Sequence, residues 1–155
     1  MPNSLLIKRK ISEFNKIISV SGDKSISIRW ILFASLGNGT SKAENLLISE
    51  DVQAAIDAVK KLGIKVIKKG KFYKIYGNGI DGFKYKKNLI INAKNSGTLG
   101  RLILGFLINA SNPIKLIGDQ SLSKRDFKRV SDPLSKFGAI LKLKNKKNLP
   151  LIIEG

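Results

Sequence analysis

An internal repeat is the sequence feature that most constrains how this chain can fold. Residues 17–36 match residues 89–108 at an offset of 72, and Arg29 falls on Arg101. In both copies an apolar, strand-like run enters a polar turn that contains glycine, and a helix-like segment follows. The two turns are Ser21–Ser25 and Lys94–Thr98. Self-similarity of this kind predicts one supersecondary unit used twice.

The match resumes at an offset of 75, where residues 57–63 fall on residues 132–138. Each segment ends on a glycine, as helices commonly do. Apolar residues at helical spacing predict a second helix in each copy. They are Val52, Ile56, Val59 and Leu62 in the first copy and Phe127, Val130, Leu134 and Phe137 in the second. Three aromatic residues at helical spacing in the first helices are expected in the core: Trp30, Phe33 and Phe106.

Strand-like runs complete each copy, one between its two helices and two after the second helix. The expected strands are 41–47, 64–68 and 72–76 in the first copy and 113–117, 139–144 and 149–153 in the second. Residues 5–7 and 16–20 are expected to form one or two entering strands. Each copy therefore reads βαβαββ, and the predicted fold class is α/β. No Pro/Gly/Ser-rich linker separates the copies, which are expected to pack as one body.

Composition removes several kinds of site. The chain has no cysteine and no histidine, which excludes disulfides, thiolate metal sites and an imidazole base. We expect no metal site. No apolar run reaches the roughly 20 residues that span a bilayer, and the basic patch 8–10 follows an apolar run, unlike a secretory signal. We therefore expect a cytoplasmic protein without a membrane partner.

The net charge of +18 has three interpretations. A basic surface attracts polyanions such as nucleic acids. Alternatively, a Lys- and Ile-rich composition spreads charge over solvated faces, or part of the charge serves a small phosphorylated substrate. The lysines are scattered and lack the interleaved aromatic residues on which bases stack. Surface spread is therefore favoured, and we do not expect a nucleic acid partner.

The two glycine-bearing turns are candidate anion sites. A helix start presents free backbone N–H groups and the positive end of the helix dipole. Lys24 and Arg29 add positive charge to the first turn, and Arg101 adds it to the second. Guanidinium groups bind carboxylates through two parallel hydrogen bonds, and an ammonium group offers a point charge to phosphate. Ordinary helix starts explain the same turns, with Asp23 or Ser25 as an N-cap, so both interpretations stay open.

Both turns also carry a resemblance to a known family. Residues 22–29, Gly-Asp-Lys-Ser-Ile-Ser-Ile-Arg, resemble the G-[DS]-K-S-x-S-x-R signature of 5-enolpyruvylshikimate-3-phosphate (EPSP) synthases, which are enolpyruvyl transferases. Residues 95–101 resemble the family motif N-[SA]-G-T-x-x-R, and residues 118–125 resemble its G-D-x-S-L-x-x-R stretch. The segments 46–63 and 132–139 continue the likeness, which follows the family's order and spacing over residues 17–155.

The resemblance implies a partial amino-terminal domain of the inverse α/β barrel type. Its two βαβαββ units would span about 19–80 and 88–155, while residues 1–18 would be entering strands that belong to the other domain. Family members are much longer, and their carboxyl-terminal domain supplies the acidic groups of proton transfer. We therefore expect a fragment that is inactive alone and that self-associates through its truncated surface.

The implied activity is that of a transferase in the shikimate pathway, which leads to chorismate and the aromatic amino acids. Enolpyruvyl would pass from phosphoenolpyruvate to the 5-hydroxyl of shikimate 3-phosphate, with no cofactor. The shikimate 3-phosphate would contact Lys24, Ser25 and Arg29. Phosphoenolpyruvate would contact Lys24, Gly97 and Arg125, with Lys24 as the catalytic residue and Asn95 and Thr98 lining the same site.

Three departures from the family pattern leave a non-catalytic relative as an alternative. Ile28 replaces a polar residue, Gly100 lies within a helix, and Asp126 places an acid beside Arg125. A UDP-N-acetylglucosamine enolpyruvyl transferase is a second alternative, although that family carries a Lys-Asn pair at the first turn and typically a reactive cysteine. An RNA-binding or RNA-processing protein built from similar units is a third.

Overall fold

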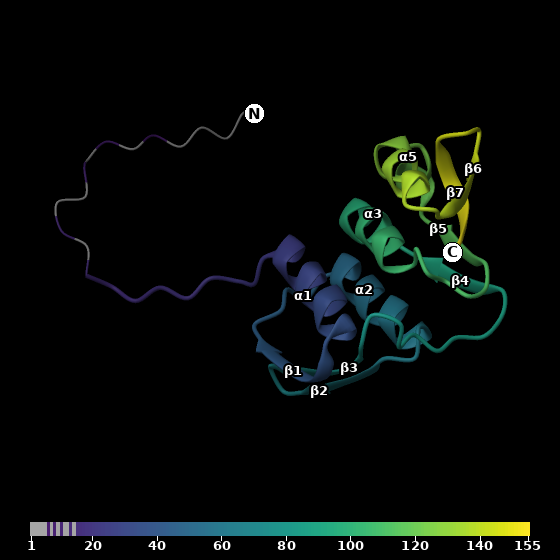
Figure 1. Ribbon diagram of the computed structural model, residues 1–155. Coiled ribbons are helices and arrows are strands. Elements are labelled where there is room, and N and C mark those ends of the chain that lie inside the picture. The colour runs from purple at the N-terminus through teal and green to yellow at the C-terminus, as the bar shows by residue number, and fades with distance from the viewer. Residues whose placement is uncertain (1–5, 7, 9, 11–12, 14) are drawn as a thin grey trace.

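The computed structural model describes Leu6, Lys8, Lys10, Glu13 and residues 15–155. Its elements are α1 (Lys24–Leu36), β1 (Asn38–Glu44), α2 (Glu50–Lys61), β2 (Lys65–Lys69), β3 (Phe72–Asn78), β4 (Leu89–Asn92), α3 (Gly97–Phe106), β5 (Ile114–Ile117), α4 (Gln120–Ser123), α5 (Lys128–Lys136), β6 (Ile140–Lys144) and β7 (Asn148–Glu154). The strands form a three-stranded sheet of order β1-β3-β2 and a four-stranded sheet of order β4-β5-β7-β6. Figure 1 shows α1 and α2 over one face of the first sheet, and α3 beside them toward the second sheet.

The second repeat has the predicted βαβαββ order. β4 pairs in parallel with β5, from Leu89 opposite Ile114 to Asn92 opposite Ile117. β7 then pairs antiparallel with both β5 and β6. One element is additional, because the single-turn helix α4 lies between β5 and α5. The sequence prediction for this half of the chain is confirmed apart from α4.

The first repeat lacks its predicted opening strand. Residues 16–20 form no strand, and their three apolar side chains are exposed: Ile17, Ile18 and Val20. In the second sheet β4 covers the edge of β5, but in the first sheet β1 pairs only with β3 among the described residues. A strand needs a partner for its backbone groups, and the carbonyl of Val20 instead accepts from the Asn45 amide at 3.1 Å. The strand predicted at 16–20 is therefore wrong, and the one predicted at 5–7 involves residues outside those described.

Backbone positions with positive φ set several element boundaries. Asn45, at φ 57°, ends β1, which therefore spans 38–44 rather than the predicted 41–47. The glycines predicted at the ends of the second helices have φ of 87° at Gly63 and 96° at Gly138. A left-handed glycine just past a helix end is a common cap. Both predicted helix ends are confirmed.

One continuous hydrophobic core contains residues of both repeats. The four apolar positions that predicted α2, from Val52 to Leu62, are all buried. One aromatic prediction is wrong, since Phe33 is 63% exposed, whereas Trp30 and Phe106 are partly buried against the core. Phe33 lies on a second apolar face of α1 and meets Phe106 edge-on at 5.4 Å. Phe137, which follows the last turn of α5, is exposed.

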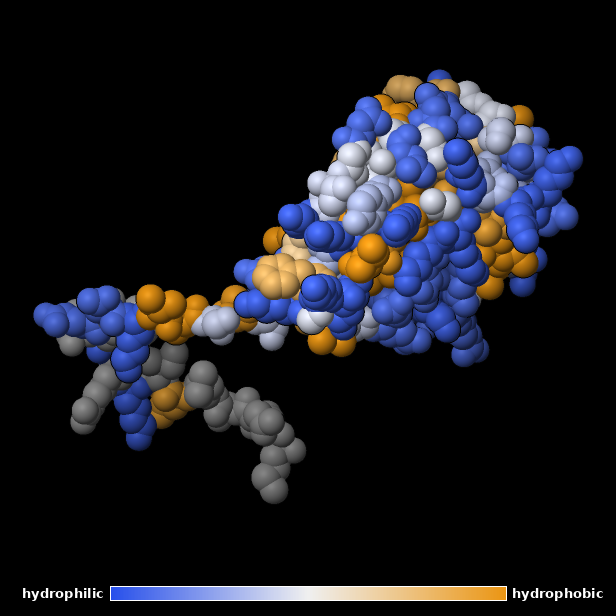
Figure 2. Space-filling view, turned by 90° about the horizontal axis from the view of Figure 1, so that it is seen from below, coloured by the Kyte–Doolittle hydropathy of each residue, from blue (hydrophilic) through white to orange (hydrophobic). Residues whose placement is uncertain are grey.

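The first sheet gathers lysines that are scattered in the sequence. We call its outer surface the lysine face, which is made by Lys42, Lys65, Lys69 and Lys74. Lys42 lies directly opposite Lys74 in the strand register. Figure 2, seen from below, shows hydrophilic residues over much of the body of the chain. Four of the 29 basic side chains therefore share one solvated sheet face.

Gly100 offers a test of the packing around α3. A Cβ at this position would lie 3.5 Å from the Ala93 Cβ and 3.5 Å from the Phe127 ring, which are ordinary contacts. Because glycine is a poor helix former, we expect Gly100→Ala to raise the free energy of unfolding by about 0.5–1 kcal/mol in urea titrations. The control Gly22→Ala should destabilise, since its Cβ would overlap the Asn45 carbonyl oxygen. Destabilisation by both substitutions would contradict the packing described.

Candidate anion-binding site

The start of α1 holds Lys24 close to the start of α2. Asp23 is the N-cap of α1 and accepts from the Ile26 N–H at 2.7 Å. The Lys24 Nζ lies 3.0 Å from the Asp51 carboxylate, in the first turn of α2. The Lys24 side chain is 52% exposed and that of Asp51 is 17% exposed. The ammonium group therefore stays accessible while one partly buried partner directs it.

Arg29 points back toward the same helix start. Its Nη1 donates to the Ser25 carbonyl oxygen at 3.2 Å, four residues earlier in α1. Helical side chains normally lean toward the helix N-terminus. The three residues predicted to bind shikimate 3-phosphate are thus brought together at one end of α1: Lys24, Ser25 and Arg29.

The start of α3 is flanked by two guanidinium groups. Ser96 caps the helix by accepting from the Leu99 N–H at 3.2 Å, and Gly97 is the first helical residue. A Cβ at Gly97 would lie 2.9 Å from the Arg125 Nη1 and 3.2 Å from the Arg101 Nη1. Both cations therefore lie at the positive end of the helix dipole, which already favours anions.

Arg101 is held against the core from within α3. Its guanidinium lies 5.5 Å from the centroid of the fully buried Phe127 ring, within range of a cation–π contact. Its Nη2 donates to the Asp126 carbonyl oxygen at 3.4 Å, while its buried Nε has no hydrogen-bond partner among the described residues.

Arg125 is bound by a chain of polar side chains. Its Nη2 donates to the Asn95 Oδ1 at 3.0 Å, and the Asn95 Nδ2 donates to the Asp119 Oδ2 at 2.6 Å. Asn95 follows β4 and Asp119 follows β5, so the parallel pairing of these strands places the two side by side. The predicted site residues Asn95, Gly97 and Arg125 are thus brought together, with Thr98 in the same first turn of α3.

The charge of Asp119 is stabilised by hydrogen bonds. The Leu122 N–H, which donates to its Oδ1 at 2.7 Å, is the main cause that lowers the pKa of Asp119 below its ordinary value of 3.8. The Asn95 side chain lowers this pKa further, and the charge of Arg125 adds a smaller contribution. A lowered carboxyl pKa means that Asp119 is ionised at neutral pH.

The Asp126 carboxylate, which the sequence places beside Arg125, is hydrogen-bonded to the start of α5. Its carboxylate accepts from the Lys128 N–H at 2.7 Å, at the start of α5. An acid at a helix start stabilises that helix. Asp126 therefore stabilises the first turn of α5.

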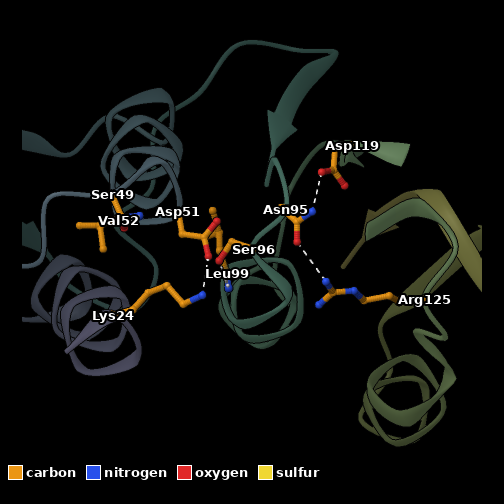
Figure 3. Close-up of polar contacts among 9 residues, drawn as sticks. All are labelled: Lys24, Ser49, Asp51, Val52, Asn95, Ser96, Leu99, Asp119 and Arg125. Atoms are coloured by element: carbon orange, nitrogen blue, oxygen red, sulfur yellow. Dashed lines mark hydrogen bonds and ion pairs between the residues drawn. The ribbon is translucent and has the colours of Figure 1, made fainter. Parts of the chain in front are cut away.

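Figure 3 shows the first turn of α3, with Ser96 and Leu99, between Lys24 on one side and Arg125 on the other. Lys24 comes from the first repeat and Arg125 from the second, and α3 contacts both α1 and α2. The two helix starts thus place several cations along one edge of the molecule, an arrangement suited to anions.

Comparison with known proteins decides the family. Residues 8–155 match the family model described as EPSP synthase (3-phosphoshikimate 1-carboxyvinyltransferase). The chain belongs to the EPSP synthase family. The enolpyruvyl transferase fold and the sequence resemblance are thereby confirmed.

Relatives in the EPSP synthase family are much longer than this chain. The 3-phosphoshikimate 1-carboxyvinyltransferase of Oceanobacillus iheyensis is 40% identical over 99% of the chain and 36% of its own length. That of Sulfurihydrogenibium sp. is 40% identical over 95% of the chain and 34% of its own length. The structure of EPSP synthase from Acinetobacter baumannii matches with a TM-score of 0.82 and 34% identity, over 89% of this chain and 32% of that one. The chain spans about a third of these relatives.

Two acidic residues contact predicted residues of the anion site, and the sequence alone did not identify either of them. Asp51 reads only as a helix-start acid, and its pairing with Lys24 joins positions 27 residues apart. Asp119 reads as part of a Gly-Asp-x-Ser turn, and its contact with Asn95 spans 24 residues. Within the described part of the chain no group of three potential metal-ligating residues occurs, and no helix is long and apolar enough to cross a membrane.

Gly97→Ala tests whether the space beside α3 matters for anion binding. The added methyl group would displace the flexible end of Arg125 rather than backbone, so stability should change little. We expect the Kd for inorganic phosphate, measured by calorimetry, to rise roughly tenfold, about 1.4 kcal/mol. Gly105→Ala is the matched control in the same helix, where a Cβ meets nothing within 4 Å. Equal affinity in the two variants would contradict the proposed position of the anion.

Proposed function

We propose that this chain is the amino-terminal part of a 3-phosphoshikimate 1-carboxyvinyltransferase, which makes EPSP for chorismate and aromatic amino acid biosynthesis. Support comes from one observation above all: two cationic helix starts, one from each repeat, lie along the same edge of the molecule. The two substrates of this reaction each carry a phosphate and a carboxylate. A pair of adjacent anion sites is what such a reaction requires.

Shikimate 3-phosphate is assigned to the start of α1. Lys24 offers a point charge to the phosphate, and Ser25 offers a hydroxyl group. Arg29, whose guanidinium is exposed and turned toward the helix start, is suited to a two-pronged contact with the carboxylate. The geometry of Arg29 supports this assignment, because its side chain already points toward the first turn.

Phosphoenolpyruvate is assigned to the start of α3. The Gly97 N–H and the Arg125 guanidinium would bind its phosphate, and Asn95 and Thr98 would line the site. The absence of a side chain at Gly97 leaves the backbone open to close approach. Arg101 adds a second guanidinium beside Gly97. Lys24, on the other side of this turn, would contact both substrates and act as the catalytic residue.

The reaction joins the 5-oxygen of shikimate 3-phosphate to C2 of phosphoenolpyruvate. In the net reaction the bond between C2 and the phosphate oxygen breaks, and the phosphate leaves as hydrogen phosphate, which accounts for the hydroxyl proton. Cations fixed before the reaction would stabilise the charge that develops on the departing phosphate. No metal or cofactor takes part in this proposal, and the groups for proton transfer are assigned to the part of the longer relatives that this chain does not cover.

The fragment is expected to be inactive alone, since it spans about a third of its relatives. We assign residues 1–18 to the second domain of the whole enzyme, and the exposed, unpaired apolar residues Ile17 and Ile18 support this. The exposed apolar face of α1, with Ile26 and Phe33, is suited to self-association of the fragment. A cytoplasmic location fits a chain without cysteine.

Calorimetric titration with shikimate 3-phosphate tests the proposed function. We expect measurable binding by the folded chain, with at least a tenfold loss in Arg29→Ala and weaker binding of shikimate without its phosphate. Arg129→Ala, which removes an exposed arginine from α5, is the charge-matched control and should bind normally. Equal losses in both variants, or RNA binding that falls steeply with salt, would instead support a general polyanion surface.

A further inference from the structure

Asn95 lies between a carboxylate and a guanidinium, and this fixes its orientation. A side-chain amide has one donor end and one acceptor end. The Asp119 carboxylate can only accept, so the donor end of Asn95 must face it, at 2.6 Å. The acceptor end is then left for Arg125, at 3.0 Å. The charge of Asp119 thus determines which atom Asn95 presents to Arg125.

Asp119 is itself anchored to backbone on two sides. Its Oδ1 accepts from the Leu122 N–H at 2.7 Å, and its own N–H donates to the Lys94 carbonyl oxygen at 2.8 Å. These bonds connect the loop after β5 to α4 and to the loop after β4. Arg125, by contrast, is an exposed side chain with many accessible rotamers. The rigid end of the chain of contacts is therefore Asp119, and the end that needs ordering is Arg125.

We propose that Asp119 is a positioning residue of the anion site, which acts through Asn95 to hold the guanidinium of Arg125 beside Gly97. The inference rests on the proposed function, because the anion assigned to Arg125 is part of it. An arginine ordered before binding loses less rotamer freedom when the anion arrives. Asp119 thereby favours anion binding although it carries a negative charge.

This role and simple electrostatics predict opposite signs. If only charge mattered, removal of the Asp119 carboxylate would raise the local positive potential and tighten anion binding. If Asp119 positions Arg125, the same change weakens binding. The sign of one affinity change therefore separates the two accounts.

Asp119→Asn is the decisive substitution. Asparagine is as good an N-cap as aspartate, so α4 should be retained. The introduced side-chain amide keeps its oxygen on the Leu122 N–H, so its NH2 group faces the NH2 group of Asn95. The Asn95 amide must then rotate, which turns its own NH2 group toward the Arg125 guanidinium. We expect the Kd for phosphoenolpyruvate and for inorganic phosphate to rise roughly tenfold. In the free chain, ¹⁵N relaxation of the Arg125 Nε–H should report faster motion than in the wild type.

Asp57→Asn is the matched control. The Asp57 carboxylate is also exposed and also accepts from a side-chain amide, that of Gln53 at 2.8 Å, but it lies on α2. The change in net charge is identical, so anion affinity should not fall. Arg125→Ala tests the proposed function separately. If that variant binds normally, the anion assignment fails; if it loses binding while Asp119→Asn does not, only the positioning role fails.

The double variant Asn95→Asp/Asp119→Asn exchanges the two groups and keeps the net charge. The acceptor toward Arg125 is restored, so the restricted motion of the Arg125 Nε–H seen in the wild type should return. Relaxation measured in the free chain reports on the positioning whether or not the anion binds. Equal Arg125 order in the wild type and in Asp119→Asn, or unchanged or tighter anion binding by Asp119→Asn, would overturn the proposal.

Discussion

The parallel pairing of β4 with β5 is the constraint on which the anion site of the second repeat depends. Beyond the paired strands, backbone hydrogen bonds continue between the two loops. The Ala93 N–H donates to the Ile117 carbonyl oxygen at 2.9 Å, and the Asp119 N–H donates to the Lys94 carbonyl oxygen at 2.8 Å. Two loops that are distant in sequence are thereby joined at the carboxyl ends of their strands. Ligand sites in α/β sheets commonly form at such ends. The start of α3 and the anchor for Arg125 both follow from this one pairing.

The first repeat reaches a similar arrangement without an opening strand. Gly22 packs directly against the backbone after β1, too closely for any side chain. The Ser27 hydroxyl donates to the Asp23 carbonyl oxygen at 2.6 Å and accepts from the Leu47 N–H at 3.0 Å. One buried serine therefore ties the first turn of α1 to the segment that leads into α2. Ile28, which departs from the family pattern, is fully buried and strengthens the core behind the site.

Local signals made much of this fold predictable from sequence. Helical spacing and glycine caps predicted α2 and α5, and Asp23 was one of the two caps expected for α1. The strand predicted at 16–20 failed because a short apolar run does not by itself supply a pairing partner. Phe33 was misplaced because helical spacing alone does not say which side of an apolar helix the core covers.

Site residues that act on their own turn were easier to predict than those that act through tertiary contacts. Lys24 and Gly97 stand within recognisable turns, and Arg29 closes the sequence signature that begins in the first of them. The contacts of Asn95 with Asp119 and Arg125 span 24 and 30 residues, and they exist only because β4 and β5 lie side by side. No local pattern carries that information. The repeat predicted the units, but it did not predict which polar groups the units would join.

The central claim is that anions bind at the helix starts rather than at the many exposed lysines. Backbone amide chemical shifts recorded during titration with phosphoenolpyruvate test this claim most directly. The account predicts that the largest changes fall on Gly97 and Thr98, with smaller changes at Lys24 and its neighbours in α1. Changes concentrated on the lysine face of the first sheet, at Lys42 and Lys74, with none at the start of α3, would contradict it.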